Sequence, residues 1–269
     1  MTTAILSALA EEQQGLIEQL ANPVRVLRAG REFWRGELHG HRVVLALSKI
    51  GKVAAATTAT TLIEAFGVHR MLFTGVAGGV GQGVQVGDVV VATEFLQHDM
   101  DASPLFPRYE IPLYGLSRFA CDADLTATLL AATHASWPGL NTRTDREKLD
   151  PKISIHSGLI ASGDRFISGA EESLALQNSL QKNGFVPLAV EMEGAAVAQV
   201  CFDYGIPFAA VRTISDRADD QAHVDFPAFV TDVASLYALA IVKHFLQLLQ
   251  ENSLSQGLTS ASTLTSPVF

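Results

Sequence analysis

The chain has 269 residues, of which 48% are hydrophobic and 17% are charged, and its formal net charge is −9. This length and apolar content suit one large domain with a sizeable core. The acidic balance argues against binding of a nucleic-acid backbone, which needs Lys and Arg in place of counterions, but it does not exclude a single nucleoside.

The N-terminus predicts no signal peptide, because MTTAILSALAEE has no basic segment and reaches acidic residues at once. The apolar run over 71–87 is interrupted by glycines and is too short for a membrane span. Cys121 and Cys201 lie far apart and match no metal spacing, so we interpret them as free thiols. We therefore expect a cytoplasmic protein with no membrane and no nucleic acid among its partners.

Short apolar runs alternate with helical patterns along the chain, which predicts an α/β fold. In the first part, strands are predicted over residues 3–9, 24–29, 42–48, 70–74 and 88–96, and helices over 10–20 and 52–66. A turn is expected at 39–41 and a glycine-rich loop at 76–86.

In the second part, helices are predicted over residues 124–134, 171–182, 194–203 and 229–249, and strands over 154–161, 187–191 and 207–213. Long loops are expected at 104–114 and 143–152. Residues 251–269 are rich in Ser and Thr without periodicity, which predicts a disordered tail after a single domain over 1–250.

Chemically reactive residues follow several predicted strands, where α/β folds place ligands. Glu191 and Glu193 flank Met192, and carboxylates there can accept hydrogen bonds from a ribose diol. An acidic helix start explains the same pattern without a ligand.

Two further acids admit two interpretations each. Asp216 follows the apolar run FAAVR, where a carboxyl group can stay protonated and protonate a purine nitrogen, although Ser215 and Asp216 also suit a helix N-cap. Glu12 can take a proton from water or be a solvated surface acid. The cluster at 97–101 is interpreted as a polar strand end rather than a metal site, because no second His or Cys cluster accompanies it.

Several segments in combination carry a resemblance to a known family. They are ALAEE (8–12), SKIGKVAAA (48–56), TGVAGG (74–79), VGDVVV (86–91), QHDMD (97–101), GLIASGDRFI (158–167), AVEMEGAA (189–196) and VRTISDRAD (211–219). In this order they resemble the methylthioadenosine/S-adenosylhomocysteine nucleosidases of the nucleoside phosphorylase superfamily. The resemblance implies a three-layer α/β/α sandwich around a mixed, twisted central sheet.

The resemblance also implies site residues. Glu12 would activate the attacking water and Asp216 would protonate N7 of adenine. The implied substrate-binding residues are Gly78, Phe166, Ile167, Met192, Glu193, Arg212, Ser215 and Phe226. Among these, Glu193 would accept the ribose diol, Phe166 would stack on adenine, and Phe226 would line the pocket for the 5′-substituent. The family needs no metal and no cofactor.

The expected function is therefore hydrolysis of 5′-methylthioadenosine, S-adenosylhomocysteine or 5′-deoxyadenosine, with release of adenine. Phosphorolysis is disfavoured, because Glu12 would repel phosphate and Val76 replaces the Ser of phosphorylases. The nucleosidases commonly have Ser there as well, so Val76 and the bulky Arg165 are departures. The alternatives are hydrolysis of aminodeoxyfutalosine or AMP, and a catalytically silent nucleoside-binding protein on the same fold.

A homodimer is expected as well. The 104–114 loop contains apolar side chains that we expect to be exposed, namely Leu105, Phe106, Ile111 and Leu113. Phe106 resembles a loop residue that reaches into the partner's pocket in the family.

Overall fold

The computed structural model describes residues 1–13, 15–140, 153–219, 229 and 233–262. Its strands are β1 (Thr2–Ser7), β2 (Ala21–Arg28), β3 (Arg31–Leu38), β4 (His41–Leu47), β5 (Arg70–Gly79), β6 (Val89–Gln97), β7 (Arg118–Ala120), β8 (Ile155–Ser162), β9 (Ala189–Glu191) and β10 (Phe208–Asp216). Its helices are the short 3₁₀ helix η1 (Glu11–Gln13), α1 (Lys52–Phe66), α2 (Ala123–Leu140), α3 (Ala170–Lys182), α4 (Gly194–Tyr204) and α6 (Ser235–Ser262).

All of these strands belong to one mixed sheet, which confirms the expected α/β class. Its order is β10-β6-β8-β9-β5-β1-β4-β3-β2, with β7 paired to β6. Because β10 also pairs with β5, the strands β5, β10, β6, β8 and β9 form a closed ring of pairings. The remaining strands extend from this ring as an open, twisted sheet.

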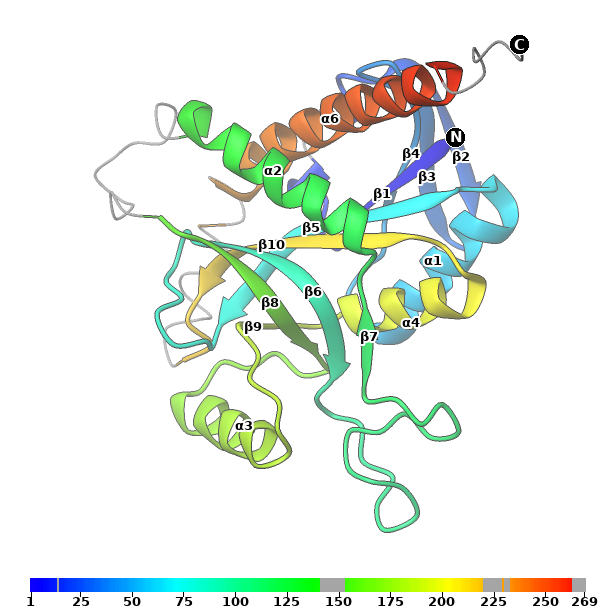
Figure 1. Cartoon of the computed structure of the whole chain (residues 1–269). Helices are drawn as coiled ribbons and strands as arrows, with labels where there is room; N and C mark the ends of the chain where they lie inside the picture. The colour runs from blue at the N-terminus through cyan, green and yellow to red at the C-terminus, as the bar shows by residue number, and fades with distance from the viewer. Residues whose placement is uncertain (14, 141–152, 220–228, 230–232, 263–269) are drawn as a thin grey trace, which may run out of the picture.

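Helices cover the sheet on both sides, as expected for three layers. Figure 1 shows α2 and α6 on one side and α1 and α4 on the other. One apolar cluster packs α1 and α4 against the sheet through residues such as Leu62 and Val197. A second packs α6 on the opposite face through residues such as Ile241 and Phe245. Among the described residues, no helix is both long enough and apolar enough to cross a membrane.

The helix predicted over 52–66 is confirmed at both ends, and Gly67 closes it in the left-handed conformation that favours glycine (φ 59°). The helix predicted over 10–20 is wrong: only Glu11–Gln13 form a helical turn. Gly15 at φ 84° interrupts the pattern, and Glu12 points into the protein instead of into water.

Other elements also differ from the prediction. A strand over Arg31–Leu38 was missed, and it forms a hairpin with β2 through a two-residue turn in which Ala29 and Gly30 both have positive φ. The predicted loop at 76–86 is wrong in its first part, because β5 continues to Gly79 and pairs with β9 and β10.

The last helix begins at Ser235 and runs on to Ser262, past the predicted end at Leu249. Its added residues contain no proline, which is the residue that most strongly ends a helix. Residues 263–269 of the predicted tail, and the whole of the predicted 143–152 loop, lie outside the described residues.

Candidate active site

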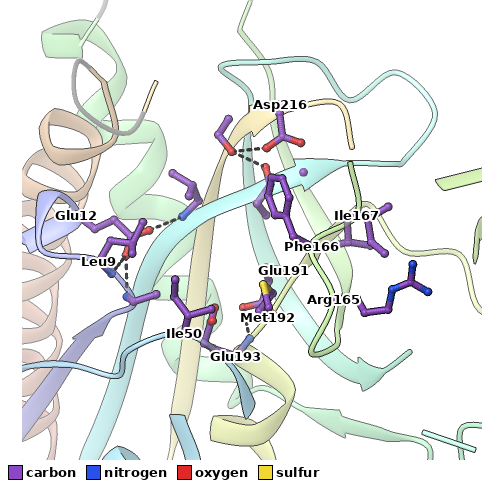
Figure 2. A pocket seen from close by; sticks show the side chains of 16 residues that line it. Leu9, Glu12, Ile50, Arg165, Phe166, Ile167, Glu191, Met192, Glu193 and Asp216 are labelled. Atoms are coloured by element: carbon purple, nitrogen blue, oxygen red, sulfur yellow. Dashed lines mark hydrogen bonds between the residues drawn. The ribbon is translucent and has the colours of Figure 1, made fainter. Parts of the chain in front are cut away.

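A cavity of about 460 Å³ lies where β1, β5, β9 and β10 end. Its lining comes from the segment after β1, the end of β5, the loop after β8 and the turn between β9 and α4, as Figure 2 shows. This is the edge at which α/β folds hold ligands, and the volume suits a small molecule.

Glu12 enters this cavity from the turn η1. One carboxylate oxygen accepts hydrogen bonds from the backbone N–H groups of Ala8 (2.7 Å) and Leu9 (2.9 Å), and the other accepts one from Val76 N–H (3.2 Å). Burial raises the pKa of Glu12 above its ordinary value, although backbone hydrogen bonds and the charge of Arg212 act in the opposite direction. The site therefore holds a fixed carboxyl group that accepts a proton more readily than an exposed one.

Asp216 ends β10 and lines the cavity away from Glu12 (Figure 2). Its Oδ2 accepts a hydrogen bond from Ser215 Oγ (2.8 Å) and its Oδ1 accepts one from Ala218 N–H (2.8 Å). The side chain is buried, and it fits because Gly78 on β5 has no side chain: a methyl group there would lie 2.9 Å from Asp216 Oδ1.

The acids on either side of Met192 have different environments. Glu193 lines the cavity, and its Oε1 accepts a hydrogen bond from Gly51 N–H (2.8 Å). Burial and the neighbouring charge of Glu191 raise the pKa of Glu193 to about 8. A carboxyl group in this state has both a donor and an acceptor to offer to hydroxyl groups.

Glu191 also lines the cavity, and several groups hold it in place. It accepts hydrogen bonds from Ser162 Oγ and from the backbone of Gly194 (2.9 and 3.0 Å to its two oxygens), and it pairs with Arg212 (2.8 Å). Arg212 is not among the residues that line the cavity: its guanidinium stacks on the Phe73 ring at 4.1 Å and donates to the Phe73 carbonyl. The structure therefore places Arg212 behind Glu191, apart from the other predicted substrate-binding residues.

The structure brings most of the predicted site residues together. Besides Glu12 and Asp216, the cavity is lined by Gly78, Phe166, Ile167, Met192, Glu193 and Ser215. Phe166 is 44% exposed and lies across the cavity in Figure 2. Phe226 lies outside the described residues, and Phe106, half-buried in its loop, does not line the cavity of its own chain.

Sequence reasoning assigned no role to the segment around Ile50 and Gly51. Ile50 lines the cavity, and the Gly51 amide holds Glu193. The available signal was the start of the predicted helix at Lys52, because amide groups at a helix N-terminus attract carboxylates.

The cluster at 97–101 forms no metal centre in the described part of the chain, where no group of three or more His, Cys, Asp or Glu residues is arranged to hold a metal ion. Asp99 instead pairs with Lys52 Nζ at 2.6 Å.

Comparisons with known proteins agree with this architecture. Residues 2–247 match the model of the phosphorylase superfamily. A 5′-methylthioadenosine/S-adenosylhomocysteine nucleosidase of Bacillus thuringiensis is 34% identical over 249 residues, which cover 92% of this chain and 99% of that relative. The crystal structure of a nucleosidase of the same name from Neisseria meningitidis, in complex with methylthio-immucillin-A, is 33% identical with a TM-score of 0.80, over 91% of this chain and 98% of the other. A futalosine hydrolase of Helicobacter pylori is 32% identical with a TM-score of 0.79, over 92% and 97%.

Proposed function

Since this chain belongs to the 5′-methylthioadenosine/S-adenosylhomocysteine nucleosidase family of the phosphorylase superfamily, we propose that it hydrolyses the N-glycosidic bond of these two nucleosides, and of 5′-deoxyadenosine, to release adenine. The observation that carries the proposal is the pair of buried carboxyl groups, Glu12 and Asp216, that face one cavity from separate sides.

The two acids pack against separate glycines of one strand. Glu12 packs against Gly75, where a methyl group would lie 3.1 Å from its Oε1, and Asp216 packs in the same way against Gly78. These glycines are three residues apart on β5, roughly 10 Å at about 3.3 Å per residue. The two acids therefore lie at separate points along β5, so that one can act on the water and the other on the departing base, as the two carboxyl groups of glycosidases divide their roles.

The charges that develop in the reaction define the role of each acid. Breaking the bond leaves negative charge on the purine, which Asp216 neutralises by donating a proton to N7. Positive charge develops on the ribose, and Glu12 removes a proton from the water that attacks it. A positioned general acid or base contributes typically about 10²–10⁴-fold. Glu193 holds the ribose hydroxyl groups and Phe166 stacks on the base.

The cavity favours water over phosphate as the nucleophile. Among its described lining residues, Arg165 is the sole Lys or Arg, and its guanidinium is paired with Glu172 at 2.6 Å. Phosphate at the sugar would meet the carboxyl groups of Glu12 and Glu193 without a cation to offset them. The same lack of free cations disfavours AMP as a substrate.

The test is adenine release, measured by chromatography from 5′-methylthioadenosine, S-adenosylhomocysteine, 5′-deoxyadenosine, aminodeoxyfutalosine and AMP, each with and without phosphate. We expect release from the first three without phosphate, with free sugar as the second product. Release only in the presence of phosphate would replace hydrolysis by phosphorolysis. No release from any substrate would favour a silent nucleoside-binding protein.

The active protein is a homodimer in this proposal. Leu105 and Leu113 are 85% and 91% exposed. Two further apolar side chains, Ile50 and Val53, are exposed near the cavity, which Ile50 lines. Ile111, expected to be exposed, is buried. Light scattering should give the mass of two chains, and Leu113→Asp should reduce it to one; a monomeric wild type would refute this part.

The free thiols of Cys121 and Cys201 support a reducing compartment such as the cytoplasm.

A further inference from the structure

Three charged residues form a hydrogen-bonded cluster next to the cavity without lining it. Lys52 is the first residue of α1, Asp99 follows β6 and Asp164 follows β8. Lys52 Nζ donates to Asp99 Oδ1 (2.6 Å), Asp164 N–H donates to Asp99 Oδ2 (2.9 Å), and Lys52 N–H donates to Asp164 Oδ1 (2.8 Å). The three bonds close a cycle, so each residue is held by the other two.

Each end of this cluster adjoins a different part of the cavity. Gly51, directly before Lys52, donates its N–H to the Glu193 carboxylate. Asp164 directly precedes the segment 165–167, which lines the cavity and includes Phe166. The Lys52–Asp99–Asp164 cluster therefore connects the side of the cavity that holds the ribose to the side that holds the base.

The side chains of the ion pair within the cluster are partly shielded from water. The side chains of Lys52 and Asp99 are 16% and 27% exposed. Burial opposes ionisation of Asp99, but hydrogen bonds from Lys52 and Asp164 outweigh it and lower the pKa of Asp99. Lys52 Nζ also donates to Gln97 Oε1 (3.0 Å), which orients the ammonium group. Such a pair holds its geometry better than an exposed one, because solvent screens it less.

The backbone around the cluster has little room to move. Gly51 has φ 96°, which favours glycine, and a methyl group there would lie 3.1 Å from Asp164 Oδ1. Gly163 packs directly on the imidazole of His98, with 2.3 Å between a methyl group built at Gly163 and the His98 Cε1 atom. A shift of Asp99 or Lys52 would therefore be transmitted to the loop at 163–167.

We propose that Lys52 and Asp99 are positioning residues, which hold the loop at 163–167 and the Gly51 amide in the arrangement that binds a nucleoside. This inference rests on the proposed function. The cluster takes no part in proton transfer. Its effect is preorganisation: when it is broken, part of the binding energy must be used to order the loop and the Gly51 turn.

Steady-state kinetics on Asp99→Ala and Lys52→Met test the proposal. With 5′-methylthioadenosine we expect KM to rise about 10-fold and kcat to change less than about threefold, because contacts to ribose and base act equally in the bound substrate and the transition state. Lys52→Arg keeps a cation at this position and should restore most of the affinity. The double variant should be no worse than either single variant, because both remove the same link.

Two controls separate positioning from general damage. Glu94→Ala removes the Glu94–Arg118 ion pair (2.7 Å), whose residues do not line the cavity, and should leave KM unchanged. Thermal unfolding establishes that each variant is folded. Unchanged KM in folded Asp99→Ala and Lys52→Met, or a KM effect as large in Glu94→Ala, would overturn the proposal.

Binding of adenine itself, measured by calorimetry, tests the cluster without turnover. We expect Asp99→Ala to bind adenine about 10-fold more weakly than the wild type, even if the natural reaction is not the proposed one. Equal adenine affinity would overturn the positioning role, whereas an inactive wild type would overturn only the proposed function.

Discussion

Replacement of Asp216 by Asn should leave the fold intact and remove the proton donor. Asp216 accepts one hydrogen bond from Ala218 N–H and one from Ser215 Oγ, both at 2.8 Å. An amide oxygen can keep the first bond. The second survives because the Ser215 hydroxyl can rotate to accept from the new NH₂ group. With no buried group left unpaired, we expect the free energy of unfolding to change by less than about 1 kcal/mol.

The chemical step should suffer much more. An amide can donate a hydrogen bond to N7 of adenine, but it cannot deliver a proton as the bond breaks. Loss of a general acid costs about 10²–10⁴-fold, which is roughly 3–5.5 kcal/mol of activation free energy at about 1.4 kcal/mol per factor of ten. The full loss should appear in kcat, because the contacts that bind the ground state remain.

The assay is single-turnover adenine release from 5′-methylthioadenosine, together with calorimetric binding of the same nucleoside. We expect Asp216→Asn to bind within about threefold of the wild-type affinity and to react at least 100-fold more slowly. The matched control is Asp203→Asn, an exposed acid that does not line the cavity, which should react normally. A rate for Asp216→Asn within about fivefold of wild type would refute the assignment of the acid.

Three other substitutions test the remaining chemistry. Glu12→Gln should lower kcat by about 10²–10⁴-fold. It should also destabilise the fold, because the new amide nitrogen would face a backbone N–H donor. Normal turnover by this variant would contradict the role of Glu12 as the base. Glu193 has its pKa raised from 4.5 to about 8 by burial and by Glu191, so the folded state binds more protons than the unfolded one and stability should fall as pH rises through this window. In Glu193→Gln, the free energy of unfolding measured in urea should vary less with pH between pH 5 and 8. The same pH dependence as in the wild type would contradict the raised pKa of Glu193. Gly163→Ala places a methyl group 2.3 Å from the Cε1 atom of buried His98. The substitution should therefore lower the free energy of unfolding by about 1–3 kcal/mol. A wild-type free energy of unfolding in urea would show that the two segments are not in contact.

Local patterns predicted much of the fold. The run KVAAATTATTLIEAF followed by Gly67 specifies both ends of α1, because small and apolar residues favour the helix and glycine favours its left-handed end. The β2–β3 hairpin was missed because its turn is Ala29-Gly30 rather than a typical Asn-Gly pair. The closed ring of strands depends on pairings between distant segments, such as β5 with β10, and no local pattern encodes these.

The resemblance predicted many of the residues that line the cavity, but not how they are arranged around it. The sequence left Glu12 as either a surface acid or a base, and its burial excludes the surface acid, since only 1% of the residue is exposed. Glu191 and Glu193 both line the cavity, yet Arg212 pairs with the first and the Gly51 amide holds the second. That difference follows from where β10 lies beside β5, which is a property of the whole sheet.

The glycines of β5 show why the segment TGVAGG (74–79) belongs to the site. TGVAGG matches no phosphate-binding pattern, and its amide groups serve the protein: Val76 N–H holds Glu12. Gly75 and Gly78 contribute through the side chains they lack, because methyl groups there would crowd the carboxyl groups of Glu12 and Asp216. Two buried acids need space as well as partners, and a strand interrupted by glycine provides that space without breaking the sheet. Val76 between these glycines has no hydroxyl group. In the proposed mechanism, activation of the attacking water therefore depends on Glu12 without help from a side chain at this position.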